Sequence, residues 1–144
     1  DTMGVLVKYE NNAILTYSLN AYMPWEGFRV AFNGSKGRIQ VTVVESTYIN
    51  AGNNLNAEGA VKEKNITVFP MFDEPYNVPI EEARGGHGGG DPVLLNDLFG
   101  TPKPDPYNRA ASHEDGTMSI LTGIAANKSI ATGMPIKIGD LIKL

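Results

Sequence analysis

The chain has 144 residues, of which 42% are hydrophobic and 19% charged, a composition typical of a globular protein with a core. The net charge of −4, without a lysine or arginine cluster, argues against a nucleic-acid partner. The absence of cysteine excludes disulfides and thiolate metal sites. No apolar run is long enough to predict a membrane span, and the start, DTMGVLVKYENN, lacks a signal-peptide layout. These features leave the compartment open, with the cytoplasm favoured.

The first half of the chain predicts antiparallel strands. Residues 4–23 form two β-rich runs joined by Asn11 and Asn12, which suit a tight turn because asparagine tolerates positive φ. Leu15 and Tyr17 share one face of the second run. A second pair of strands flanks the turn NGSKG. Because this start enters a strand pattern at once and has no initiator methionine, we interpret residues 1–144 as one domain of a longer polypeptide.

The middle of the chain is less regular. Residues 47–64 are rich in Asn, Gly and Ala and predict an exposed insertion. The segment ITVFPMF then resumes a strand, which lies at a sheet edge or ends at Pro70. EPYNVPI predicts one more short extended piece.

The second half predicts two helices. Asp91 fits a helix cap with Pro92 in the first turn, and Gly100 ends that helix. A longer helix begins at His113 and ends at Gly133, with an apolar face. The members of that face are Met118, Leu121, Ile124, Ala125 and Ile130. Strands followed by helices predict an α+β fold, with helices packed on one face of a mostly antiparallel sheet.

The segment RGGHGGGD places His87 on a glycine-rich stretch before a helix, and three hypotheses compete for its role. A phosphate cradle is disfavoured, because neither a βαβ unit nor a GxxxxGK[ST] pattern is present. A functional imidazole is favoured by its ordinary pKa of about 6.5, which suits general acid–base catalysis. The third hypothesis is a plain turn with His87 in water. Residue types alone do not decide between the last two.

Other candidates for chemistry carry weaker signals. His87, Asp91, His113 and Asp115 match no zinc-ligand spacing, so a metal site is disfavoured. Trp25 and Glu26, close to Arg29, either line a sugar site or form a strand-entry turn in which Trp25 covers the sheet edge. Arg109 either pairs with a nearby acid or contacts a ligand.

Two strand pairs and two later segments carry a resemblance to a known family. The first pair contains Tyr9, Asn11, Tyr17, Ser18 and Ala21, and the second contains Glu26, Gly27, Arg29, Gly34, Gly37, Arg38 and Ile39. The later segments are GGHGGGDPVLLNDLF and DGTMSILTGIAANKSIATGMPIKIGDL. Together they resemble the C-terminal domain of Gfo/Idh/MocA-type oxidoreductases, in a branch with a GGHGGGD motif. The resemblance covers nearly the whole chain except the Asn-rich segment.

The resemblance implies a partner domain and a substrate. Such proteins bind NAD or NADP in an N-terminal Rossmann domain, which lies outside this chain, and most move a hydride to or from a sugar or cyclitol. The C-terminal sheet commonly forms a homodimer or higher homo-oligomer. His87 is then a catalytic or substrate-contacting residue, with Gly88 and Asp91 shaping the pocket. Trp25, Glu26 and Arg109 are further candidates for substrate binding.

The chain also departs from the family pattern. It has no nucleotide-binding fingerprint and no Glu-Lys-Pro motif, where the usual catalytic lysine lies. We therefore expect the fragment alone to bind no cofactor and to be inactive. The leading hypothesis is the substrate-binding and dimerisation domain of an NAD(P)-dependent sugar oxidoreductase. The alternatives are a domain of an NAD-dependent glycoside hydrolase of the same superfamily, which shares a His-Gly-Gly motif, and a non-catalytic assembly module.

Overall fold

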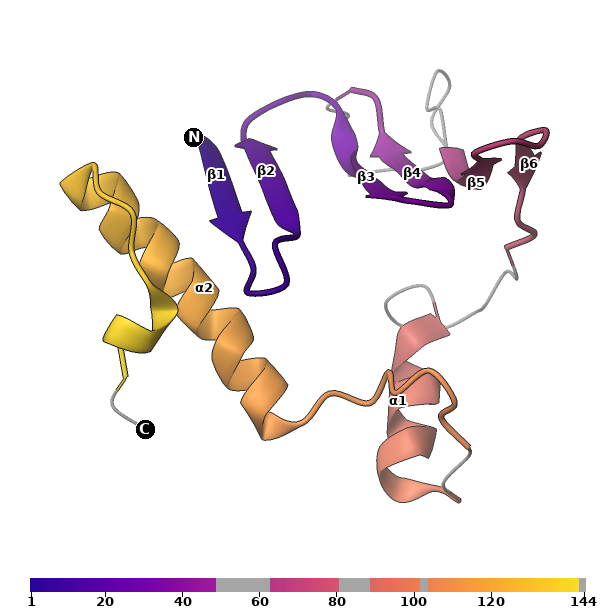
Figure 1. Ribbon diagram of the computed structural model, residues 1–144. Helices are drawn as coiled ribbons and strands as arrows, with labels where there is room; N and C mark the ends of the chain where they lie inside the picture. Colours follow the sequence, from indigo (N-terminus) through magenta and orange to yellow (C-terminus); the bar gives the residue numbers. More distant parts are fainter. Residues whose placement is uncertain (49–62, 81–88, 102–103, 143–144) are drawn as a thin grey trace. The chain divides into compact units, whose positions relative to one another are not determined.

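The computed structural model describes residues 1–48, 63–80, 89–101 and 104–142, and the Asn-rich segment lies mostly outside them. The chain forms two compact units, Asp1–Gly4 with Ser18–Pro92 and Val5–Tyr17 with Val93–Leu144. The elements follow one another as strands and then helices (Figure 1). They are β1 (Thr2–Lys8), β2 (Ile14–Asn20), β3 (Glu26–Gly34), β4 (Gly37–Ser46), β5 (Glu63–Pro70), β6 (Tyr76–Asn77), α1 (Gly90–Phe99), α2 (His113–Thr132) and the 3₁₀ turn η2 (Ile138–Asp140). The predicted α+β class is confirmed.

The β1–β2 hairpin closes through the predicted asparagine turn. The Asn12 amide donates to the Tyr9 carbonyl oxygen at 3.0 Å, and the Tyr9 amide donates to the Ala13 oxygen at 2.9 Å. Asn12 has a φ of 66°, the left-handed conformation that ends a three-residue hairpin loop. The Asn11 side-chain oxygen accepts from the Ala13 amide at 3.0 Å. Both asparagines thus have a direct role in the turn.

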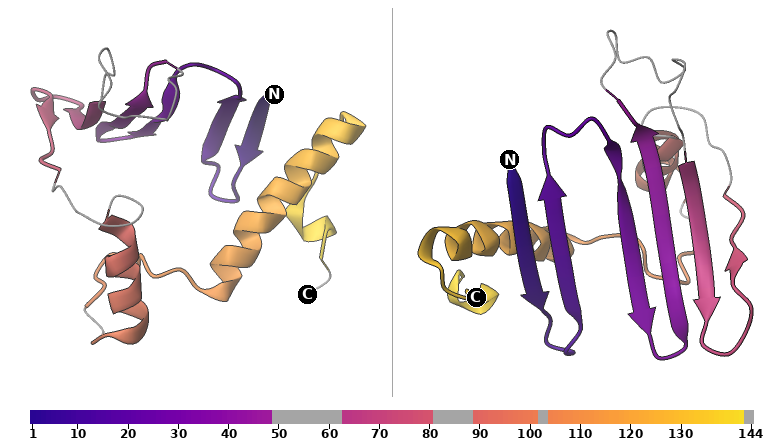
Figure 2. Two further views of the ribbon diagram at one scale, coloured as in Figure 1. Left: turned by 180° about the vertical axis from the view of Figure 1, so that it is seen from behind. Right: turned by 90° about the horizontal axis from the view of Figure 1, so that it is seen from above.

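A four-stranded antiparallel sheet forms the main body of the first unit (Figure 2). Its strand order is β3-β4-β5-β6, and the β3–β4 turn consists of Ser35 and Lys36. Pro70 ends β5, as predicted, but β5 lies between β4 and β6 rather than at the edge. Within the described residues the six strands form two sheets, where the sequence led us to expect one.

Strand register gives the four-stranded sheet two different faces. Phe28 pairs with Val43 and Val41 pairs with Ile66, and directly paired residues point to the same side of the sheet. One side, the apolar face, therefore carries Phe28, Val30, Phe32, Ile39, Val41, Val43, Ile66 and Val68. The other side, the polar face, carries Arg29, Asn33, Arg38, Gln40, Thr42, Asn65, Thr67 and Asn77, with Glu26 and Glu63 at its end and Ala31, Val44 and Phe69 among them. The expected alternation of apolar and polar residues is confirmed for most positions, with Lys64 on the apolar face and Val44 and Phe69 on the polar face as exceptions.

Helix α2 begins and ends where the sequence predicts. Its cap Ser112 and Asp115 form a capping box, in which each side chain accepts from the other residue's backbone amide. Gly133 has a φ of 70° and its amide donates to the Ser129 carbonyl oxygen at 2.8 Å. The expected apolar face is right only for Leu121 and Ala125, which are buried. Met118, Ile124 and Ile130 are about half exposed or more, so helical spacing alone was a poor guide to burial.

Helix α1 differs from the prediction at its start. It begins at Gly90, so Asp91 lies inside the first turn rather than before it. A carboxylate in that turn is still favourable, because the amide groups at a helix N-terminus carry partial positive charge. The Gly100 amide donates to the Asn96 oxygen at 2.8 Å, as expected for the helix end.

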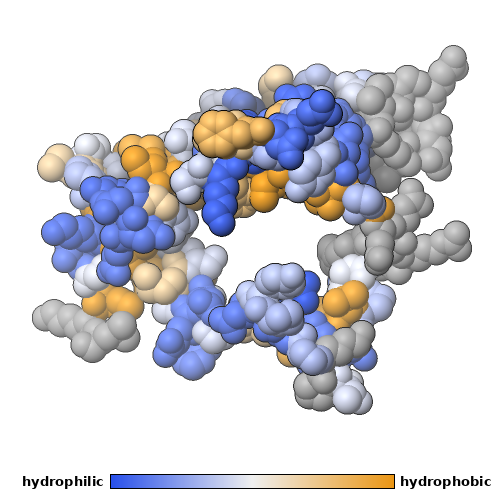
Figure 3. All heavy atoms as spheres, turned by 45° about the vertical axis from the view of Figure 1, so that its right-hand side comes forward, coloured by the Kyte–Doolittle hydropathy of each residue, from blue (hydrophilic) through white to orange (hydrophobic). Residues whose placement is uncertain are grey.

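Apolar side chains lie widely exposed on the described part of the chain, as the orange atoms in Figure 3 show. The buried hydrophobic residues there are Val44, Leu121 and Ala125. None of the helices in the described ranges is both long and apolar enough to span a membrane.

Candidate functional site

The segment PWEGFR begins β3 and brings Trp25 and Arg29 together. The pairing of β3 with β4 shifts between Glu26 and Gly27, a bulge that changes the direction of the preceding residues. Gly27 has a φ of 154°, and a β-carbon there would overlap the Val43 carbonyl oxygen. The same β-carbon would lie 3.1 Å from the Trp25 ring. The indole therefore lies over a position that only glycine leaves open.

The Trp25 ring also contacts a cation. The Arg29 guanidinium carbon lies 5.2 Å from the ring centroid, within the range of a cation–π interaction. On the polar face Arg29 is paired with Thr42, which is buried, and Gly27 with Val44, which is also buried. These positions support the hypothesis that Trp25 covers the edge of the sheet. Trp25 is only partly buried, so part of its ring is also accessible to a ligand.

Arg38 is held by two side-chain hydrogen bonds on the polar face. Its two terminal nitrogens donate to Asn33 Oδ1 at 3.0 Å and to Gln40 Oε1 at 2.9 Å. Both partners are neutral amides, so the guanidinium is oriented while its charge is not cancelled. The sequence motif that included Arg38 gave no role to Asn33 or Gln40. The signal was present in the hairpin, because a two-residue turn pairs Asn33 with Arg38.

A row of uncharged groups continues the polar face across β5 and β6. The Thr67 hydroxyl lies 3.1 Å from Asn65 Oδ1 and 2.8 Å from Asn77 Oδ1. The side-chain nitrogen of Asn65, Nδ2, donates to Glu63 Oε1 at 3.3 Å. Guanidinium, amide and hydroxyl groups are hydrogen-bonding partners for a ligand rich in hydroxyl groups. The carboxylates of this face among the described residues, Glu63 and Glu26, both lie at the end of a strand. The middle of the face carries neutral and cationic groups, which suit it to binding such a ligand.

Arg109 lies in a tight loop before α2. Its Nε contacts Asp105 Oδ1 at 3.4 Å, and its guanidinium carbon lies 6.0 Å from the Tyr107 ring centroid. Asp105 Oδ2 accepts from the Ala110 amide at 2.8 Å. That backbone hydrogen bond, together with Arg109, holds the pKa of Asp105 below its usual value. The hypothesis that Arg109 pairs with a nearby acid is confirmed, and its side chain stays largely exposed.

The other predicted site residues lie in different parts of the chain. His87 and Gly88 lie outside the described residues. Trp25, Glu26 and Asp91 belong to the first compact unit and Arg109 to the second. Glu26 is exposed and pairs with Ser46 on β4. Within the described ranges no three His, Cys, Asp or Glu side chains form a group that could hold a metal ion, and the Asp115 carboxylate is engaged with Ser112.

Comparison with known proteins identifies the class to which this chain belongs. The family described as "Oxidoreductase family, C-terminal alpha/beta domain" matches residues 1–138. The chain therefore belongs to the Gfo/Idh/MocA oxidoreductase family, as its C-terminal domain. A relative in Bacillus subtilis (strain 168), named "Putative oxidoreductase YteT", is 36% identical over 145 residues. That alignment covers 100% of this chain and 32% of the relative, so the chain spans about a third of its length. No solved structure gives a significant match.

Proposed function

We propose that this chain is the substrate-binding and dimerisation domain of an NAD(P)-dependent oxidoreductase that acts on a sugar or cyclitol by hydride transfer. The family match over residues 1–138 carries the proposal at the level of an oxidoreductase. The sugar or cyclitol substrate is supported by the polar face, where oriented guanidinium, amide and hydroxyl groups lie on one sheet surface. Trp25, at the edge of that sheet, adds a flat apolar ring of the kind that stacks on a sugar.

The nucleotide cofactor belongs to another part of the polypeptide in this proposal. A dinucleotide fold needs a parallel strand leading into the glycine-rich turn and its helix. Among the described residues, the last strand before α1 is β6, which has two residues and runs antiparallel to β5. In the proposal a Rossmann domain outside this chain binds the nucleotide.

His87 is the residue to which we assign chemistry. It lies two positions before Gly89, where the description of the chain resumes, and α1 begins at Gly90. In the proposal the imidazole accepts or donates a proton at a substrate hydroxyl or carbonyl oxygen, with Gly88 and Asp91 beside it. Glu26 and Arg109 are proposed as further contacts with the substrate.

The test compares two histidine variants of the full polypeptide. A panel of sugars, cyclitols and aryl glycosides is assayed for NAD(P)H formation and for released aglycone. His87→Ala is expected to lower kcat by at least about a hundredfold, the scale of general acid–base catalysis. The other histidine of the chain, His113, is exposed at the start of α2, so His113→Ala is the matched control and should leave the rate unchanged.

Each other result has a definite meaning. Equal rates for a folded His87→Ala variant and the wild type would remove His87 from the chemistry. Aglycone release without net NAD(P)H would assign the protein to the glycosidase branch instead. No turnover of any substrate by the full polypeptide would favour the non-catalytic assembly module.

A further inference from the structure

Arg38 is a cation that the four-stranded sheet orients without giving it a counter-ion. Its hydrogen bonds to Asn33 and Gln40 use two of the five N–H groups of a guanidinium. The ion pair found in the described part of the chain is Arg109–Asp105, so no carboxylate there neutralises Arg38. The Arg38 side chain is partly buried, and its other N–H groups have no partner among the described residues.

The carboxylates of the polar face lie too far away to compete for Arg38. Glu63 pairs with Val44, which lies six residues beyond Arg38 on β4. At about 3.3 Å per residue the separation is roughly 20 Å, about twice the distance over which salt screens exposed charges. Glu26 pairs with Ser46, which is farther still from Arg38. These two acids therefore leave the charge of Arg38 uncancelled.

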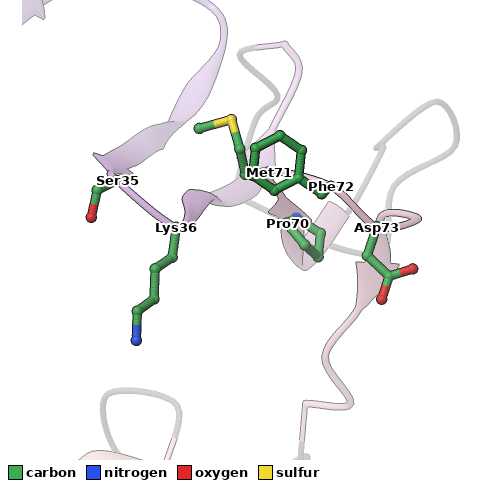
Figure 4. A pocket seen from close by; sticks show the side chains of 6 residues that line it. All are labelled: Ser35, Lys36, Pro70, Met71, Phe72 and Asp73. Atoms are coloured by element: carbon green, nitrogen blue, oxygen red, sulfur yellow. The ribbon is translucent and has the colours of Figure 1, made fainter.

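The two turns at the same end of the sheet do not neutralise Arg38 either. The Met71 amide donates to the Lys36 carbonyl oxygen at 3.0 Å, which joins the turn after β5 to the β3–β4 turn. Figure 4 shows Asp73 pointing to the same side as Lys36, a residue of opposite charge. Asp73 Oδ1 also accepts from the Glu74 amide at 2.8 Å, and neither acid forms an ion pair with Arg38. Arg38 thus keeps its positive charge available at this end of the polar face.

The groups beside Arg38 on the polar face match the rest of a sugar ring. Arg38 pairs with Phe69 on β5, whose side chain is partly buried. Two residues away along β5, the Thr67 hydroxyl lies 2.8 Å from Asn77 Oδ1. The Arg38–Phe69 and Gln40–Thr67 pairs are roughly 7 Å apart, about the length of one pyranose ring with its substituents. An aromatic ring next to a few placed polar groups is the usual lining of a small-molecule site.

Charge and shape favour a carboxylate over a phosphate as the partner of Arg38. A guanidinium donates two parallel hydrogen bonds to a planar carboxylate, and their single charges balance. A phosphate monoester carries nearly two negative charges at neutral pH. The other arginine of the polar face, Arg29, lies against Trp25 and pairs with Thr42, four residues from Arg38 along β4. At roughly 13 Å, Arg29 is too distant to share one phosphate with Arg38.

We infer that the polar face around Arg38 binds the carboxylate of a sugar acid, with the sugar ring on Phe69 and its hydroxyl groups at Gln40, Thr67 and Asn77. This site rests on the proposed function and narrows its substrate to a hexuronic acid or a glycoside of one. Asn33 and Gln40 hold the guanidinium in advance, so little side-chain freedom is lost when the carboxylate binds.

The test measures binding and turnover of matched sugars by the full polypeptide with NAD or NADP present. Galacturonate and glucuronate are compared with galactose and glucose, which carry a hydroxymethyl group in place of the carboxylate, and with the 6-phosphates of both. Isothermal titration calorimetry gives Kd, and NAD(P)H absorbance gives the rate. One of the uronates should bind about thirtyfold more tightly than its neutral counterpart, as expected for hydrogen bonds between charged groups.

Three variants separate a specific contact from a general effect of charge. Arg38→Gln should weaken uronate binding by about thirtyfold and leave the Kd of the neutral sugar unchanged. Arg38→Lys keeps the charge but loses the planar pair of donors, so it should recover only part of the affinity. Lys36→Gln removes a neighbouring cation outside the site and is the matched control, with every Kd unchanged. Circular dichroism checks that each variant is folded.

Failure of this site and failure of the proposed function give different results. Uronate binding that depends on Arg38, without NAD(P)H from any sugar, would refute hydride transfer and support the site. Turnover with equal Kd values for uronates and neutral sugars, or with tighter binding of the 6-phosphates, would overturn the site and leave hydride transfer standing. Absence of uronate binding would also overturn it, as would an equal effect of Lys36→Gln and Arg38→Gln.

Discussion

Gly27 shows how a single residue shapes the candidate site. Its φ of 154° is rarely adopted by residues with a side chain, and the Val43 carbonyl oxygen occupies the place of a β-carbon. We predict that Gly27→Ala lowers the free energy of unfolding by about 1–3 kcal/mol, because either the bulge or the β3–β4 pairing must change. Urea unfolding of the full polypeptide measures this difference.

Gly123 provides the opposite case as a control. It lies inside α2, and a β-carbon there would meet nothing within 4 Å. Gly123→Ala should raise the stability by up to about 1 kcal/mol, since alanine is the better helix former. If the two substitutions had the same effect, the strain assigned to Gly27 would be refuted.

At the same scale, the pairing of Arg109 with a nearby acid was predicted from the sequence, whereas the contacts of Trp25 and Arg38 were not. Trp25, directly before β3, lies against Arg29 in that strand, and Arg109 contacts Asp105, four residues before it. Both contacts are local in the sequence. The hydrogen bonds between Arg38 and its amide partners depend on strand register. A slip of one residue would move the side chains of one strand to the other face of the sheet.

Among the elements, α2 has the clearest local signal in the sequence for where it begins. Ser112 caps the helix, and hydrogen bonds from the Ser112 backbone amide and then its hydroxyl hold the pKa of Asp115 below the ordinary value of 3.8. Ser112→Ala should lower the stability by about 1 kcal/mol, the usual effect of losing a cap. The free energy of unfolding, followed by circular dichroism in urea, checks this value.

The capping box also predicts a dependence on pH. Because the pKa of Asp115 is lowered on folding, its stabilising effect is complete above the ordinary value of 3.8 and is lost as the pH falls through the lowered pKa. The wild type should therefore be more stable than Asp115→Asn at neutral pH, and this difference should shrink in acid. A difference that stays constant down to the lowest pH would contradict the assignment.

Element boundaries were predicted better than burial, and the reason is physical. Caps, turns and proline act within a few residues, so the ends of α2, the β1–β2 turn and the end of β5 follow from local chemistry. Burial depends on what covers a face. The side chains of α1 and most of the apolar side of α2 are exposed, although their spacing is amphipathic.

For the whole molecule, we propose that the face of β2 that carries Leu15 and Tyr17 forms the dimer interface. Leu15 and Tyr17 alternate along β2 and are 41% and 46% exposed. If this face forms the proposed interface, Tyr17→Glu should dissociate the dimer, because burying an unpaired carboxylate is unfavourable. Thr16→Glu, on the opposite face of the same strand, is the control. Sedimentation equilibrium would show half the mass for the first variant, and equal masses for both variants would remove this face from the interface.

The central claim, transfer of a hydride to or from a sugar or cyclitol, is tested most directly with an isotope label. The full polypeptide is given NAD or NADP and, in separate reactions, a sugar, a cyclitol or an aryl glycoside that carries deuterium at the carbon to be oxidised. The account predicts that deuterium-labelled NAD(P)H accumulates in step with oxidised product, as measured by mass spectrometry. Release of sugar that keeps its label, with no labelled NAD(P)H accumulating, would contradict it.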